Sequence, residues 1–169
     1  MSESARTLAD RFEAAHDAFM SYVEGLDEVQ WLTLVPDEQR TVAAMVHHIA
    51  WGYAVEMESF VAMAEGRNPK TYTMDDFARF NAAHGEEYAE CDKTETLALL
   101  RANGLRAASK IRTFTDEQLE RTGKYVETAP EMTVSRWIER VLTGHITGHE
   151  RNIRETLGHG PVTAEGPPA

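Results

Sequence analysis

Histidines carry the clearest chemical signal in this sequence of 169 residues. His145 and His149 are four residues apart, so a helix would present both imidazole rings on one face. They continue an apolar stripe through Ile138 and Leu142, which directs them towards the interior of a helical bundle. Two buried imidazoles are costly unless their nitrogens are satisfied. A divalent metal would satisfy them, and so would hydrogen bonds to neighbouring carboxylates or carbonyls.

A third nitrogen could come from two adjacent histidines earlier in the chain. His47 and His48 lie in a periodic segment that begins at Thr41, a good helix N-cap. Consecutive helical residues point about 100° apart, so both rings cannot face one centre equally. Either could supply the third nitrogen. Three histidines and an open position are typical of a reactive metal site, whereas a closed site would need a fourth ligand, for which His47 or Glu56 is the candidate.

Two glycines stand directly before the paired histidines. Gly144 precedes His145 and Gly148 precedes His149. Glycine inside a helix costs about 1 kcal/mol relative to alanine, so each of them needs a reason. They could leave room for a ligand or water near a metal, or they could allow another helix to pack closely. The sequence favours neither explanation.

Several common catalytic motifs are absent from the sequence. Ile146 follows His145, so the glutamate of the HExxH metalloproteases is missing. There is no GxSxG serine motif and no phosphate-binding glycine loop. The pair of Glu-x-x-His motifs that di-iron bundles carry on two helices is also absent. Cys91 lies in an acidic turn, which disfavours a reactive thiolate. The remaining histidines are interpreted as ordinary structural or surface residues: His16, His84 and His159.

The elements that would position these residues are helices. Prolines punctuate the sequence without interrupting any periodic apolar segment. Helical spacing marks residues 4–25 and 41–66, stretches after 73 and after 92, a short turn after 115, and residues 133–157. No alternating strand pattern competes with them. The fold class is therefore all-α, a four-helix bundle with one or two short extra helices, and its long middle connection predicts a crossover.

Composition excludes several classes of partner. The chain has 17 Lys and Arg against 28 Asp and Glu, and its net charge of −11 argues against binding nucleic acid or a membrane surface. No apolar run reaches the roughly 18–20 residues of a membrane span. The polar start and the single cysteine fit a cytoplasmic protein. We expect one domain over residues 1–158 and a loose tail over residues 159–169.

Two segments resemble motifs of the DinB-like family. Residues 41–50, TVAAMVHHIA, resemble a second-helix motif in which a capping Ser or Thr precedes a ligand histidine by seven residues. The matching residue in that register is His48. Residues 143–150, TGHITGHE, resemble the last-helix motif that supplies two more ligands, and Phe80-Asn81-Ala82 resembles a further family segment. The resemblance covers roughly residues 4–158.

The resemblance implies a four-helix bundle with a divalent metal ion, zinc, nickel or iron, held by His48, His145 and His149. It also implies a homodimer in many members. Related proteins include mycothiol-dependent maleylpyruvate isomerase and bacillithiol transferases, whose metal binds a low-molecular-weight thiol as thiolate. One segment departs from the pattern: many members have Arg-Gly-Gln after the last histidine, where this chain has Glu150-Arg151-Asn152. The three ligand positions of the family are present in this chain, but the resemblance does not assign it the reaction of a particular member.

Two classes of function therefore remain open. The first is a metal-dependent enzyme acting on a small-molecule substrate, in which the metal lowers the pKa of a bound thiol or water. Thiol transfer and small-molecule hydrolysis use the same residues, and the resemblance favours thiol transfer. The second is a non-catalytic module that binds a metal or a small ligand. An open coordination position beside a pocket would favour the enzyme.

We further predict a homodimer, because large apolar side chains exceed what one small core needs to bury. They are Trp31, Trp51, Trp137, Phe77 and Phe80. Light scattering at micromolar concentration should give the mass of a dimer. A monomer under those conditions would contradict this prediction.

Overall fold

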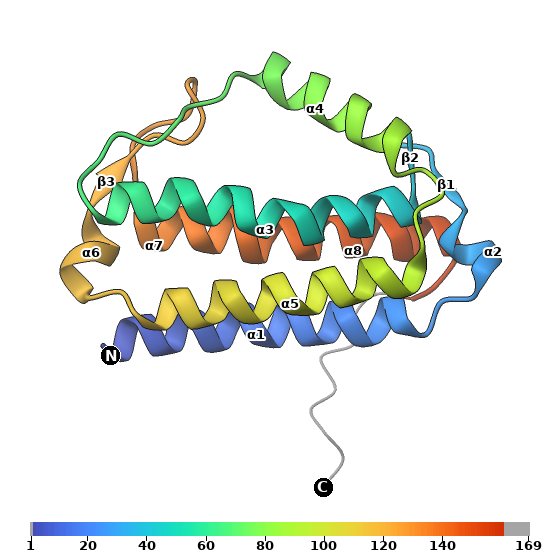
Figure 1. Cartoon of the computed structure of the whole chain (residues 1–169), viewed down its shortest axis with the longest axis horizontal. Coiled ribbons are helices and arrows are strands. Elements are labelled where there is room, and N and C mark those ends of the chain that lie inside the picture. The colour runs from blue at the N-terminus through green and yellow to red at the C-terminus, as the bar shows by residue number, and fades with distance from the viewer. Residues whose placement is uncertain (1, 161–169) are drawn as a thin grey trace, which may run out of the picture.

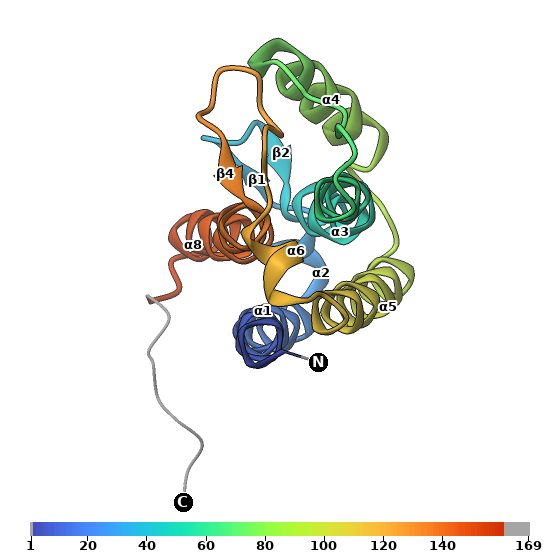
Figure 2. The same cartoon turned by 90° about the vertical axis from the view of Figure 1, so that its left-hand side faces the viewer.

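The computed structural model describes residues 2–160 and contains a bundle of long helices. These are α1 (Glu3–Glu24), α3 (Val42–Ala64), α5 (Lys93–Arg112) and a last helical run from Val134 to Leu157. Figures 1 and 2 show them lying side by side. The predicted all-α four-helix bundle is confirmed. Residues 161–169 of the predicted tail lie outside the described residues, whereas His159 contacts α1 through the Tyr22 hydroxyl at 3.0 Å.

Shorter elements connect and extend the long helices. The short helices are α2 (Glu28–Trp31), α4 (Met74–Glu87) and α6 (Asp116–Glu120). The last run consists of α7 (Val134–Trp137), a π-helical segment η1 (Ile138–Thr143) and α8 (Gly144–Leu157). Two small antiparallel ladders pair β1 (Leu34–Val35) with β2 (Arg40–Thr41), and β3 (Thr122–Gly123) with β4 (Met132–Thr133). The sequence pattern did not predict α2, the ladders or the π-helical segment. Within the described residues, no helix has the length and apolar character needed to cross a membrane.

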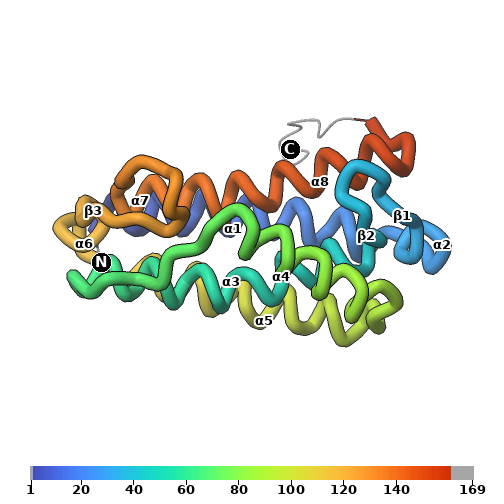
Figure 3. Tube along the Cα trace, turned by 90° about the horizontal axis from the view of Figure 1, so that it is seen from above, coloured from blue at the N-terminus to red at the C-terminus, as the bar shows by residue number. Residues whose placement is uncertain are grey.

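The order of the helices requires a crossover. α1 packs against α5 and the last helical run, and α3 packs against the same two neighbours. Because α3 and α5 point in the same direction, the chain must return along the bundle between them (Figure 1). α4 makes this return above the other helices, as the view in Figure 3 also shows. The predicted crossover is therefore confirmed, and α4 becomes a roof over one face of the bundle.

Local hydrogen bonds set where the helices begin. At seven N-caps, a side-chain oxygen accepts a hydrogen bond from the backbone N–H three residues later. The residues are Ser2, Asp27, Thr41, Thr73, Asp92, Thr115 and Thr133. Each such cap typically contributes about 1 kcal/mol. The last helix ends at Gly158 in the left-handed conformation, with φ of 68°, as its sequence predicts.

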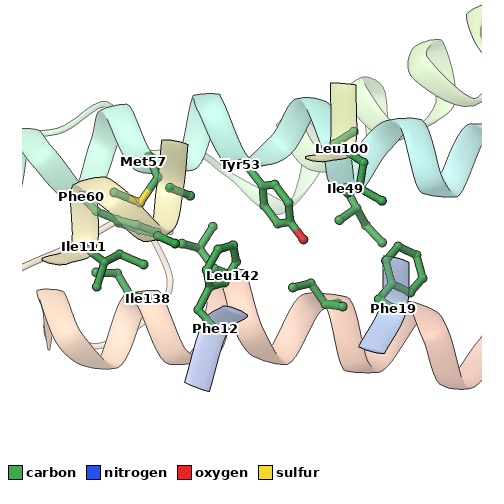
Figure 4. Close-up of a cluster of buried hydrophobic side chains, with 14 of the residues drawn as sticks. Phe12, Phe19, Ile49, Tyr53, Met57, Phe60, Leu100, Ile111, Ile138 and Leu142 are labelled. Atoms are coloured by element: carbon green, nitrogen blue, oxygen red, sulfur yellow. The ribbon is translucent and has the colours of Figure 1, made fainter. Parts of the chain in front are cut away.

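The core fills the space between the four long helices. Figure 4 shows Phe12 and Phe19 of α1 close to residues of α3 and the last helix. Such side chains are almost fully buried, and each contributes about 1.5–3 kcal/mol by leaving water. Trp31 and Trp137 are also buried, but Trp51 and Phe80 are 42% and 43% exposed. The homodimer stays a prediction.

One histidine belongs to this core. His16 is 4% exposed, and its Nδ1 lies 3.2 Å from the Tyr53 hydroxyl. Burial lowers the pKa of His16, so the ring is neutral. α5 passes directly over the ring at Gly104, where a Cβ atom would come within 2.4 Å of His16 Cε1. The absence of a side chain at residue 104 is therefore what allows α1 and α5 to enclose the ring.

We predict that Gly104→Ala destabilises the protein. Alanine improves helix propensity, but its Cβ would lie 2.4 to 2.8 Å from three atoms of the His16 ring, and overpacking a buried site costs about 1–3 kcal/mol. Gly148→Ala is the matched control, because a Cβ there would meet nothing within 4 Å. It should raise the free energy of unfolding by about 0.5–1 kcal/mol. Urea denaturation measures both, and equal stabilisation by the two variants would contradict the packing argument.

Candidate metal centre

Three histidine side chains meet between α3 and α8. His149 Nε2 lies 2.7 Å from His145 Nε2, and His48 Nε2 lies 3.4 Å from the same atom. One nitrogen of each ring falls within 4.8 Å of the other two. Within residues 2–160, this is the only group of three or more His, Cys, Asp or Glu side chains placed closely enough to hold a metal ion.

Two helices bring these rings together. His48 lies seven residues after the Thr41 cap, about two turns into α3. His145 and His149 are one turn apart on α8, which packs against α3. The structure thus places together the three residues that we expected as ligands. Their role as metal ligands remains a prediction.

Carboxylates outside the cluster orient two of the rings. Glu38 Oε1 lies 3.0 Å from His149 Nδ1, and Glu56 Oε1 lies 3.5 Å from His145 Nδ1. An ionised carboxylate only accepts hydrogen bonds, so it favours the proton on Nδ1 and leaves a lone pair on Nε2. Burial lowers the pKa of His149, which keeps that ring neutral. Two lone pairs would then face each other across 2.7 Å, an arrangement that a bound cation stabilises.

The position of Glu38 depends on a small polar network. Its Oε1 accepts a second hydrogen bond, from Asn152 Nδ2 at 2.7 Å, and its Oε2 accepts one from Arg40 Nη2 at 2.5 Å. The hydrogen bond from His149 holds the pKa of the Glu38 carboxyl well below its usual range. Glu38 is therefore ionised at neutral pH and able to hold the His149 proton.

Arg40 is the buried partner in this network. It is 5% exposed, and its Nε and Nη1 have no acceptor among the described residues. Its side chain passes beneath α4 at Gly85, where a Cβ atom would lie 2.7 Å from Arg40 Cγ. The roof helix, the β1–β2 turn and α8 are thus linked through Arg40 and Glu38.

A second histidine pair lies beside the cluster. His47 Nδ1 is 3.0 Å from His84 Nε2, and the His47 ring stacks on Tyr88 with centroids 3.7 Å apart. The His84 ring lies 5.6 Å from that of His48, and burial lowers the pKa of His84 to about 4. His47 is therefore engaged away from the three-histidine group. His84, which we interpreted from the sequence as an ordinary structural or surface residue, borders the site.

The site opens into a cavity of about 580 Å³. His48, Glu56, His145 and Gly144 line it, together with aromatic residues. These are Trp51, Tyr72, Phe77, Phe80, Tyr125 and Trp137. Neither His47 nor Glu56 belongs to the three-histidine group, so neither closes it as a fourth ligand. A cavity of this size suits a small organic molecule.

The glycines before the paired histidines do not serve close packing of another helix. A Cβ at Gly148 would meet nothing within 4 Å, and one at Gly144 would meet only the Glu139 carbonyl of the same helical run, at 3.4 Å. Gly144 instead lies in the cavity wall.

Cys91 does not line this cavity, and burial raises the pKa of its thiol, in agreement with the inert role expected for it.

We predict that Glu38→Gln weakens metal binding about 10- to 100-fold, the usual cost of losing a hydrogen-bond partner of a histidine ligand. Glutamine lacks the charge that holds the His149 proton on Nδ1. Zinc titration by calorimetry measures this. Glu139→Gln is the control, since Glu139 forms an exposed ion pair with Arg11 and belongs neither to the three-histidine group nor to the cavity wall. Unchanged zinc affinity in Glu38→Gln would show that Glu38 does not support the site.

Solved structures share this fold. YfiT from Bacillus subtilis, described as "a probable metal-dependent hydrolase with an unusual four-helix bundle topology", aligns with a TM-score of 0.70 and 21% identity, over 95% of this chain and 91% of YfiT. An uncharacterised protein from Clostridium difficile 630 gives 0.74 and 14%, over 94% and 98% of the two chains. DfsB, a sibling lethal factor precursor, gives 0.72 and 20%, over 94% and 97%. At these identities the likeness establishes the fold alone.

No curated protein sequence matches the chain. The model of the DinB superfamily matches residues 11–152, which is most of the chain and includes all three histidines of the cluster. The resemblance seen in the two sequence motifs is therefore confirmed over residues 11–152, and the chain belongs to the DinB superfamily.

Proposed function

We propose that this protein binds a divalent metal ion through His48, His145 and His149 and activates a low-molecular-weight thiol for transfer to a small electrophile. The observation that supports this most is the convergence of three Nε2 atoms, two of them from the cavity-lining residues His48 and His145, without a fourth side-chain ligand among the described residues. Three imidazoles suit zinc, nickel or iron. A site left open by its protein ligands is typical of catalytic rather than structural metal centres.

The chain's own residues would prepare the ligands. A bound divalent metal supplies Lewis acidity that lowers the pKa of a coordinated thiol or water. Glu38 holds the proton on His149 Nδ1, and Glu56 faces the corresponding atom of His145. Burial lowers the pKa of His48, so its ring is neutral and available as a ligand. Neutral imidazoles leave the full charge of the cation available to a fourth ligand.

The cavity would hold the second reactant. Its walls are mainly apolar and aromatic, so they favour an organic molecule over water beside the histidines. α4 provides Phe77 and Phe80 from above, while α3 provides Trp51. A thiol placed at the histidines and an electrophile held in the cavity would be neighbours, which reduces the entropic cost of their reaction.

Small-molecule hydrolysis is the second candidate, and one residue favours it. Glu56 is 7% exposed and lines the cavity beside His145. A carboxylate at this place could take a proton from a water molecule, the task that the missing HExxH glutamate performs in metalloproteases. A thiol needs less help, because its pKa of about 8.5 already lies near neutral pH.

We predict that His48→Ala abolishes tight metal binding, whereas His47→Ala retains most of it. His48 Nε2 faces His145, but His47 is bonded to His84. Elemental analysis of the purified variants, supported by zinc titration, measures the difference. The His47 variant is the matched control, since it removes the neighbouring ring of the same helix. Metal loss in His47→Ala with retention in His48→Ala would show that the register is wrong.

We also predict that the metal-loaded protein accelerates thiol addition to electrophiles more than ester or amide hydrolysis. Addition of cysteine or glutathione to an activated alkene forms a carbon–sulfur bond and passes the thiol proton to the adjacent carbon. Loss of this thiol consumption in His145→Ala, which removes one ring of the cluster, is expected. Hydrolysis of 4-nitrophenyl acetate provides the comparison.

Glu56→Gln separates the two candidate reactions. If Glu56 only orients His145, the variant should bind metal more weakly and recover thiol addition when zinc is in excess. If hydrolysis is the true activity, the zinc-saturated variant should lose ester turnover through loss of the proton acceptor. Equal rates for the wild type and His145→Ala in all reactions would instead indicate a non-catalytic binding module.

A further inference from the structure

Two positively charged side chains line the cavity, whose wall is mainly apolar and aromatic. Lys70 and Arg140 belong to its wall, and neither has an acidic partner within 4.0 Å among the described residues. Glu56, the one acidic residue of the wall, is 7% exposed and faces His145. The cavity therefore carries unpaired positive charge in a chain whose net charge is −11.

The two cations lie away from the histidines along the cavity. Arg140 precedes His145 by five residues in the last helical run, so it lies more than one helical turn before that histidine, within the π-helical segment η1. Lys70 lies before the start of α4, whereas His84, near the end of α4, is the residue beside His48. The ten residue-to-residue steps from Met74 to His84 correspond to about 15 Å of helix. One end of the cavity thus offers imidazoles, and the other offers positive charge.

The wall between these ends is aromatic. Tyr72, Phe77 and Tyr125 form a cluster in which the ring centroids lie 5.4 to 6.0 Å apart. Lys70 Nζ lies 5.0 Å from the centroid of the Tyr72 ring, so its charge is held against this cluster. Burial of a ligand's apolar body against such a surface stabilises the complex, and the two cations would fix which end of the ligand faces them.

We propose that the cavity binds an amphipathic organic carboxylate, with its apolar or aromatic body on the aromatic wall and its carboxylate at Lys70 and Arg140. The opposite end of such a ligand then faces His48 and His145. As a statement about the electrophilic substrate, this inference rests on the function proposed above. As a statement about binding, it depends only on the cavity and its two cations.

The test compares one ligand with and without its charge. Calorimetry on the purified full-length protein at low salt measures the affinity for 5-phenylpentanoate and for the neutral 5-phenylpentanamide. We expect the acid to bind about fivefold more tightly, the scale of one or two partly exposed charge pairs. Without a specific site, the net charge of −11 would oppose the acid instead. An acid that binds no more tightly than the amide overturns the proposal.

Paired variants assign the preference to the two cations. Combining Lys70→Gln with Arg140→Gln should bring the ratio of acid affinity to amide affinity close to one, because it removes both positive charges from the cavity wall. The control combines Lys124→Gln with Arg136→Gln, two exposed cations outside the cavity wall, and should keep the wild-type ratio. Both pairs act at the surface, so folding should be preserved. A ratio that survives in the first pair overturns the proposal, because the carboxylate is then bound elsewhere, including directly by a metal.

Repeating the titrations in His145→Ala separates this inference from the proposed function. If the acid preference persists in His145→Ala and still depends on Lys70 and Arg140, the carboxylate site stands even when no thiol chemistry is found. If the wild type binds metal and consumes thiols but shows no acid preference, the proposed function stands and the carboxylate site is wrong.

Discussion

The site depends on one constraint, which is that three neutral imidazoles must point their Nε2 lone pairs at the same place inside a helical bundle. An acceptor at the opposite nitrogen fixes this orientation, and carboxylates lie there for His149 and His145, whereas His48 Nδ1 has no hydrogen-bond partner among the described residues. Glu38 is the acceptor for His149, but a half-buried carboxylate is itself costly unless it is satisfied. Asn152 and Arg40 donate hydrogen bonds to this carboxylate, and the Arg40 side chain in turn needs the space that Gly85 leaves by having no Cβ. A single carboxylate therefore couples the β1–β2 turn, α4 and α8 to the geometry of the histidines.

The cavity follows from the topology rather than from the metal ligands. Since α3 and α5 run in the same direction, the chain must cross back, and α4 does so as a roof (Figure 1). Gly85 is the one buried residue of α4, so apolar packing holds this helix much less firmly than the bundle below it. The crossover thus provides an apolar cover over the histidines without filling the space with a packed core.

The sequence predicted what local interactions determine and missed what distant contacts determine. Helix starts at Thr41, Thr73 and Asp92 follow from hydrogen bonds between a cap side chain and a backbone N–H three residues later. Spacing alone leaves His47 and His48 as equal candidates, and only the family resemblance favours His48. Glu38 is 111 residues from His149 and lies in a turn, so no sequence spacing predicts their contact. Asn152 could have been found, because it follows His149 by three residues on the same helical face. The two-residue strands are too short for any alternation to mark them.

The two carboxylates beside the histidines are not equivalent, and this difference bears on the chemistry. Glu38 has three partners, His149, Asn152 and Arg40, so transferring a proton to it would break an ionic network. Glu56 has one approach of 3.5 Å to His145, and it lines the cavity. Only Glu56 can therefore both orient a ring and exchange a proton with a bound molecule. Glu56, on α3, is the one carboxylate among the cavity-lining residues, so the helix that carries the histidine pair contributes none there. The type of reaction that the site supports therefore depends on whether Glu56 only accepts a hydrogen bond from His145 or also accepts a proton from a bound molecule.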